Sequence, residues 1–163
     1  MTTINPAADT ADREIVISRV FDAPRELVWE ALTDPARVVK WWGPTGFSTT
    51  IEKMEVRPGG TWLQVMRGPD GTEYPNKSVF TEVVKPERLV YLHGGGKKGG
   101  PQVQFVMTWT LDAVGEGKTK LTIRQVYESA AERDKVAHEF GAIEGGKQTL
   151  ARLAEFLAGK TES

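Results

Sequence analysis

From Phe47 onward the chain alternates apolar and polar residues with a period of two, which is typical of β-strands with one buried face. Six strands are predicted, separated by turns rich in glycine and proline. They cover residues 47–56, 61–67, 77–84, 88–93, 102–111 and 119–127. An earlier strand, 14–21, is rich in β-branched residues. Because the later strands are joined by short connections, the pattern favours an antiparallel meander.

Three segments have helical spacing instead. They cover residues 22–34, 34–42 and 129–158. Asp22 or Ala23 is the expected N-cap of the first helix and Asp34 that of the second, and each has a proline in its first turn. The third is predicted to be one long helix that begins with a capping box formed by Ser129 and Glu132. Since an antiparallel sheet with one apolar face needs a cover, we expect the long helix to pack across it.

The chain has 163 residues, a formal net charge of −1 and no cysteine. The length predicts one domain, which we place at residues 14–160 behind a flexible segment, 1–13. The charge is unlike that of a nucleic-acid binder, and the lack of cysteine excludes disulfides and thiolate chemistry. No apolar run is long enough to cross a bilayer, and the polar N-terminus lacks the order of a secretory signal. The expected location is therefore the cytoplasm.

Two glycine–lysine segments resemble phosphate-binding loops, but neither has the required context. Residues 141–148 end in Gln148 within a helical pattern, and residues 112–119 lie in a predicted hairpin. A phosphate loop follows a strand and opens a helix, so nucleotide hydrolysis is not expected. With only His93 and His138 in the chain, no histidine-rich metal site and no cofactor is predicted. His93 precedes a glycine run at a strand end, where it is either exposed or at the rim of a cavity, and we expect it to be exposed.

Two other features are unusual for their positions. Gly145 and Gly146 lie within the long predicted helix, where each glycine costs about 1 kcal/mol relative to alanine. Either the helix packs closely on the sheet there, or the missing side chains leave room for a ligand. We expect Gly146 to face that ligand, so that an added methyl group finds space. Glu82 is the second feature, because the apolar Phe80 and Val84 are predicted to share its face.

Several motifs occur in an order that resembles a known family. They are F-D-A-P at 21–24, W-W-G-P at 41–44, R-P-G-G at 57–60, P-D-G at 69–71 and P-E-R-L at 86–89. The chain after residue 13 is similar to bacterial proteins related to the C-terminal domain of the activator of Hsp90 ATPase, within the START/Bet v 1-like superfamily. Ser78, where such proteins often have glycine, and the long loop 94–100 depart from the pattern.

The resemblance implies an α+β helix-grip fold. In this fold a curved antiparallel sheet of about seven strands, two short helices and a long C-terminal helix enclose an apolar cavity. We expect Trp41 to pack in the core and Trp42 to lie at the cavity mouth, although both could simply plug the end of the sheet. The candidate ligand-binding residues are mostly aromatic or apolar: Trp42, Trp62, Met66, Phe80, Glu82, Tyr91, Phe105, Met107, Trp109, Gln125, Ile143 and Gly146.

Three classes of function remain open. An inward set rich in Trp, Met, Phe and Tyr favours a binding module for a small hydrophobic or aromatic molecule. The family name alone suggests a co-chaperone-like module that stimulates an Hsp90-type ATPase in a stress response. A cyclase or hydrolase using Glu82 or Tyr91 is the third class, although no convergent acid–base pair is predicted. The expected partner is a small molecule or a chaperone, with no nucleic acid and no membrane insertion, and the chain is expected to be a monomer or weak homodimer.

Overall fold

The computed structural model describes residues 11–96, 98–100, 102–139 and 142–159, so most of the predicted flexible segment, residues 1–10, lies outside the described residues. Within the described part, the elements in chain order are η1 (Ala11–Arg13), β1 (Glu14–Phe21), α1 (Arg25–Thr33), α2 (Pro35–Trp41), β2 (Ser48–Met54), β3 (Thr61–Arg67), β4 (Glu73–Val84), β5 (Arg88–Gly96), β6 (Gln102–Gly115), β7 (Lys118–Val126), α3 (Ala130–Glu139) and α4 (Ala142–Leu157). None of the described helices is both long and apolar enough to span a membrane.

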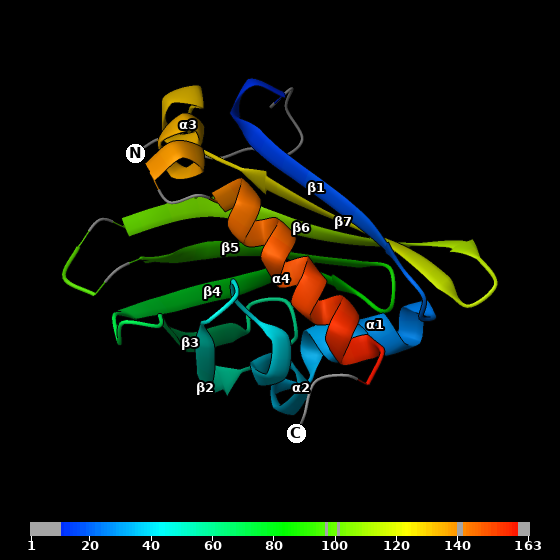
Figure 1. Cartoon of the computed structure of the whole chain (residues 1–163). Helices are drawn as coiled ribbons and strands as arrows, with labels where there is room; N and C mark the ends of the chain where they lie inside the picture. Colours follow the sequence, from blue (N-terminus) through cyan, green and yellow to red (C-terminus); the bar gives the residue numbers. More distant parts are fainter. Residues whose placement is uncertain (1–10, 97, 101, 140–141, 160–163) are drawn as a thin grey trace.

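The seven strands form one antiparallel sheet in the order β1-β7-β6-β5-β4-β3-β2. Strands β2 to β7 are therefore a meander, and β1 joins its far edge beside β7 (Figure 1). The predicted α+β helix-grip architecture is confirmed. Three strands are longer than predicted. β4 begins at Glu73 instead of Lys77, and β6 continues past Leu111 to Gly115. β5 was predicted to end at His93 but continues through the glycines to Gly96. These glycines were assigned to a loop, yet they pair with β4 and β6.

The two short helices begin at different kinds of N-cap. In α2 the Asp34 carboxylate accepts a hydrogen bond from the backbone N–H of Ala36 at 3.1 Å, as predicted. The prediction for α1 is wrong, because Pro24 is its N-cap and makes no side-chain hydrogen bond. Both helices lie at one end of the sheet (Figure 1). Trp41, the last residue of α2, is fully buried and donates its indole N–H to the carbonyl oxygen of Ala31, which confirms its place in the core.

The C-terminal region forms two helices instead of the single helix that was predicted. The Ser129 hydroxyl accepts a hydrogen bond from the backbone N–H of Glu132, so the predicted N-terminal cap is present. α3 contacts η1 and β1, whereas α4 crosses the inner side of the sheet and contacts β1, α1 and α2 (Figure 1). α3 ends at Glu139 and α4 begins at Ala142. Residues 140–141, between the two helices, lie outside the described residues.

Candidate functional site

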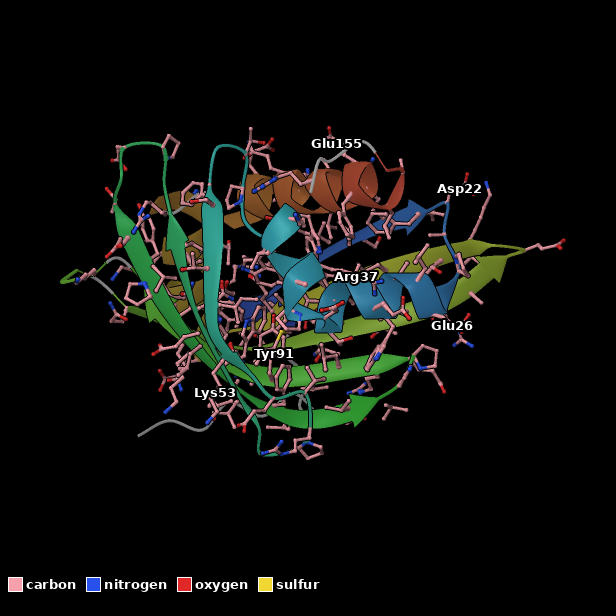
Figure 2. All side chains as sticks on the ribbon, turned by 90° about the horizontal axis from the view of Figure 1, so that it is seen from below. Asp22, Glu26, Arg37, Lys53, Tyr91 and Glu155 are labelled. Atoms are coloured by element: carbon pink, nitrogen blue, oxygen red, sulfur yellow. The ribbon has the colours of Figure 1, made fainter. Side chains whose placement is uncertain are left out.

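A cavity of about 420 Å³ lies between the inner face of the sheet and α4. This volume falls within the range of roughly 300–1,000 Å³ that is typical of small-molecule sites. Eight of the twelve candidate residues line it: Trp42, Met66, Tyr91, Phe105, Met107, Trp109, Gln125 and Gly146. Figure 2 shows Tyr91 on the inner side of the curved sheet. Strands β3, β5, β6 and β7 thus bring together side chains that are far apart in the sequence.

Two candidates, Trp62 and Phe80, lie behind the cavity wall instead of on it. Both are buried, and their rings stack with centroids 6.3 Å apart and an angle of 4° between the planes. The ring of Trp42 packs edge-on against Trp62 at 4.8 Å and itself lines the cavity. Trp62 and Phe80 therefore belong to the core layer that supports the wall.

Glu82 and Ile143 do not line the cavity either. The register between β4 and β5 shifts between Phe80 and Glu82, which is a β-bulge. The bulge shifts the inward–outward alternation of β4 by one residue, so the side chain of Glu82 points outward. Its Oε2 forms an ion pair with Nε of Arg88 at 3.1 Å. Ile143 is 42% exposed in the first turn of α4, before the part of this helix that reaches the cavity at Gly145. The enzymatic interpretation thereby loses one of its two candidate residues.

The sequence analysis missed further residues of the cavity wall. They are Gly43, Pro44, Phe47, Tyr74, Asn76, His93, Gly95, Gly96, Val103, Ile123, Tyr127, Val136, Gly145, Thr149 and Leu150. Ile123 and Tyr127 share the alternating face of Gln125, so the strand pattern was sufficient to find them. Pro44 lies in a segment without periodicity, where no sequence signal indicates the direction of a side chain. Phe47 was predicted to begin a strand, but β2 begins one residue later, at Ser48.

His93 was predicted to be exposed, and that prediction is wrong, because the residue lines the cavity, as in the alternative interpretation. Because β5 continues past His93, the side chain of His93 points to the same side of the sheet as that of Tyr91, two residues earlier. It lines the cavity and is half-buried. Its ring stacks on Phe105 with centroids 4.7 Å apart, and Nδ1 lies 3.2 Å from the hydroxyl oxygen of Ser78. Burial lowers the pKa of His93 to about 4, so the imidazole is neutral at pH 7.

The other polar groups of the wall are also uncharged. Tyr91 accepts a hydrogen bond from the indole N–H of Trp109 at 3.0 Å, and Tyr127 donates to the side-chain oxygen of Gln125 at 2.6 Å. Burial raises the pKa of both tyrosines above the usual value, so both hydroxyls keep their protons. Among the described lining residues there is no Asp, Glu, Lys or Arg. Within the same part of the chain, no group of three or more His, Asp or Glu side chains is arranged to hold a metal ion.

Residues 42–47, which we call the wall loop, are fastened to α4. One terminal nitrogen of Arg152, Nη1, donates to four backbone carbonyl oxygens at 3.0–3.2 Å, and they belong to Trp42, Gly43, Pro44 and Phe47. One turn earlier on α4, the side-chain oxygen of Gln148 accepts a hydrogen bond from the backbone N–H of Thr45. These contacts place Trp42, Pro44 and Phe47 on the cavity wall.

Gly145 and Gly146 face different surroundings, and this corrects the expectation of open space at Gly146. A Cβ atom at Gly145 would lie 3.5 Å from Pro44 Cγ, which is ordinary contact. At Gly146 it would lie 2.8 Å from Ile17 Cδ1 on β1, so the isoleucine would have to shift. Close packing of helix and sheet therefore explains Gly146, even though this residue also borders the cavity.

Alanine substitutions at the two glycines are expected to differ in their effects. Gly145→Ala should raise the free energy of unfolding by about 0.4–1 kcal/mol, because alanine restricts the unfolded chain and fits the site. Gly146→Ala should raise it by less, because Cδ1 of Ile17, the end of a flexible side chain, must first move aside. Denaturant midpoints of the two variants test this pair. An equal gain at Gly146 would show that Ile17 moves aside without cost.

A larger but shallower hollow of about 670 Å³ also occurs on the sheet. Leu63, Lys77 and Gln104 line it, and Glu52 and Glu128 contribute carboxylates. No aromatic ring lines it among the residues that the structure describes. Since ligand sites are usually concave and rich in apolar and aromatic side chains, we place the candidate site in the inner cavity.

Comparisons with known proteins agree with this fold. A protein from Mycobacterium smegmatis with a crystal structure is 27% identical, with a TM-score of 0.82 over 97% of this chain and 98% of that chain. A protein from Arthrobacter aurescens, solved by NMR, is 28% identical, with a TM-score of 0.84 over 96% and 91% of the two chains. A protein from Nitrosomonas europaea is 29% identical, with a TM-score of 0.78 over 92% and 97%. No curated protein matches the chain.

The sequence profile of one family also matches residues 22–158. This range begins at Asp22 in the F-D-A-P motif and ends one residue after α4. The match covers most of the chain and includes the wall loop, the sheet from β2 to β7 and Arg152. The chain therefore belongs to the family of activator of Hsp90 ATPase homolog 1-like proteins.

Proposed function

We propose that this protein binds a small hydrophobic or aromatic molecule in the inner cavity. The observation that carries the proposal is a space of about 420 Å³ lined by the rings of Trp42, Tyr91, Phe105 and Trp109 and by the thioether of Met107. Aromatic rings supply large apolar contact areas, and a preformed apolar cavity is the usual form of a small-molecule site. The family relationship supports a ligand-binding or activator-like module in general terms.

The two other classes of function have less support. Docking on an Hsp90-type ATPase rests on the family name. A cyclase or hydrolase needs an acid and a base that converge on the substrate, and Glu82 points away from the cavity. Tyr91 does line the cavity, but burial raises the pKa of its phenol, so the hydroxyl keeps its proton at pH 7 and has no base form to offer. We therefore propose binding without chemistry.

Filling the cavity from α4 tests the proposal. Thr149 lines the cavity, so Thr149→Phe places a ring in the ligand's space. We expect this variant to bind N-phenyl-1-naphthylamine, an uncharged polarity-sensitive dye, more than about tenfold more weakly than the wild type does. Titration of dye and tryptophan fluorescence measures both the affinity and the expected 1:1 ratio.

The matched control is Lys147→Phe, which adds the same ring to an exposed position of α4. It should bind the dye like the wild type. If the wild type binds neither this dye nor similar uncharged probes, or if Thr149→Phe binds unchanged, the cavity is not the binding site. Stimulation of a cognate Hsp90-type ATPase that survives Thr149→Phe would favour the co-chaperone alternative.

A further inference from the structure

The lack of formal charge on the described part of the cavity wall restricts the charge of the ligand. No described lining residue carries a formal charge, and His93 stays neutral at pH 7 because burial lowers its pKa. Arg152 on α4 lies beside the wall loop, but its Nη1 is directed at the carbonyl oxygens of that loop. Moving a carboxylate from water into such surroundings leaves its charge without a partner, which is costly. An uncharged molecule avoids this cost.

The wall nevertheless offers hydrogen bonds at two separate points. On β5, Nδ1 of His93 is hydrogen-bonded to Ser78 of the neighbouring strand β4, so the second ring nitrogen, Nε2, is left for a ligand. On β7, the side-chain oxygen of Gln125 accepts from Tyr127, so the amide nitrogen of Gln125 is left as a donor. Strand β6 lies between them, which separates the two backbones by about 10 Å.

An apolar stripe connects these two points. It consists of Phe105 and Met107, which are the cross-strand partners of His93 and Tyr91. Both side chains are buried and line the cavity. A flat aromatic molecule that lies on this stripe would direct its edges at Nε2 of His93 and at the amide nitrogen of Gln125. If the edge of the molecule carries no polar group, the protein atom that it faces has no hydrogen-bond partner. Sites of this kind discriminate by the penalty for an unpaired buried group.

The Ser78–His93 contact prepares the imidazole for either kind of partner. If the Ser78 hydroxyl donates to Nδ1, the proton of the neutral ring lies on Nε2, which then donates to a ligand oxygen. If Nδ1 donates to Ser78, Nε2 accepts from a ligand hydroxyl. Stacking on Phe105 fixes the plane of the ring in both cases. A hydroxyl or a carbonyl group on the ligand can therefore be accommodated.

We propose that the cavity selects an uncharged aromatic molecule that carries a hydroxyl or carbonyl group, and that His93, oriented by Ser78, binds this group through Nε2. This proposal rests on the proposed function and narrows it to a class of ligand. Ser78 is a positioning residue, and His93 is a binding residue that determines specificity.

The test uses three probes with one ring system: naphthalene, 2-naphthol and 2-naphthoate. In fluorescence titrations of the wild type at pH 7, 2-naphthol should bind about tenfold more tightly than naphthalene, which corresponds to one well-placed hydrogen bond. The anion 2-naphthoate should bind at least about tenfold more weakly than 2-naphthol. His93→Phe keeps a ring for stacking on Phe105, so 2-naphthol and naphthalene should bind to this variant with about equal affinity.

A second readout needs no variant. The ¹⁵N shift of His93 Nε2 in the wild type should move on addition of 2-naphthol and stay in place with naphthalene. Equal binding of 2-naphthoate and 2-naphthol would overturn the selection of uncharged molecules. An unchanged Nε2 shift, or a full advantage of 2-naphthol in His93→Phe, would overturn the role of His93. If none of the three probes binds, the proposed function itself fails, and this outcome is distinct from the others.

Discussion

Replacing Arg152 with methionine is expected to lower the free energy of unfolding by about 2–4 kcal/mol. Methionine keeps most of the aliphatic volume, so the loss reports on the guanidinium group. Nη1 of Arg152 donates to carbonyl oxygens of Trp42, Gly43, Pro44 and Phe47, and these lose a charged donor. Its two N–H groups are shared among four acceptors, so the loss is smaller than four full hydrogen bonds. A denaturant midpoint with an unchanged slope measures the effect.

The control for this prediction is Arg37→Met. Arg37 lies on the surface and pairs with Glu30 at 3.0 Å and with Asp34 at 3.6 Å. Exposed ion pairs contribute about 0–1 kcal/mol, so this variant should be close to the wild type. Arg152→Met should also weaken binding of uncharged dyes, because Trp42 is no longer held in the cavity wall. Equal stability of the two variants would contradict the anchoring of the wall loop by Arg152.

Lowering the pH from 6.5 to 4 is expected to remove about 2–3 kcal/mol of stability through His93 alone. The pKa of His93 is lowered from 6.5 to about 4 in the folded protein, because burial disfavours the charged imidazolium. Between these pH values the unfolded chain binds a proton that the folded chain does not. Stability therefore decreases as the pH falls through this range, and above it the contribution is constant.

His93→Gln isolates this effect from other acid-labile groups. The pKa of Glu55 is lowered by a hydrogen bond from the backbone N–H of Thr61, and that of Glu73 by its hydrogen bond with Arg67, so both also favour unfolding in acid. These contributions cancel in the difference between wild type and variant. We expect that difference to shift in favour of His93→Gln as the pH falls from 6.5 to 4. A difference that does not vary with pH would show that His93 titrates normally.

The strand pattern predicted most of the fold because it depends on local alternation. Strand β3 has the predicted bounds, and Phe105, Met107 and Trp109 are buried as expected. The errors occur where one residue changes the alternation or a segment lacks it. A single bulge at Thr81 directs Glu82 outward. The three glycines after His93 belong to β5, but their composition predicted a loop. Neither feature can be recognised from the hydropathy of the segment itself.

The candidate site was harder to predict than the fold because its wall combines distant parts of the chain. Trp42 was assigned to the cavity because its neighbour Trp41 was assigned to the core, and adjacent residues face different directions. Ser78 was noted as a departure from the family pattern. In the structure its hydroxyl is hydrogen-bonded to His93, which lies opposite it on the adjacent strand. A contact of this kind depends on the register between strands, which a single sequence does not determine.

Intermolecular NOEs in the complex with N-phenyl-1-naphthylamine show whether the dye occupies the inner cavity. They locate the ligand independently of affinity and of any variant. Binding in the inner cavity predicts NOEs from the dye to the side chains of Met107, Ile123 and Leu150, which line it. NOEs confined to Leu63 and Val65, which line the shallow hollow on the sheet, would contradict it, as would the absence of any NOE at saturating dye.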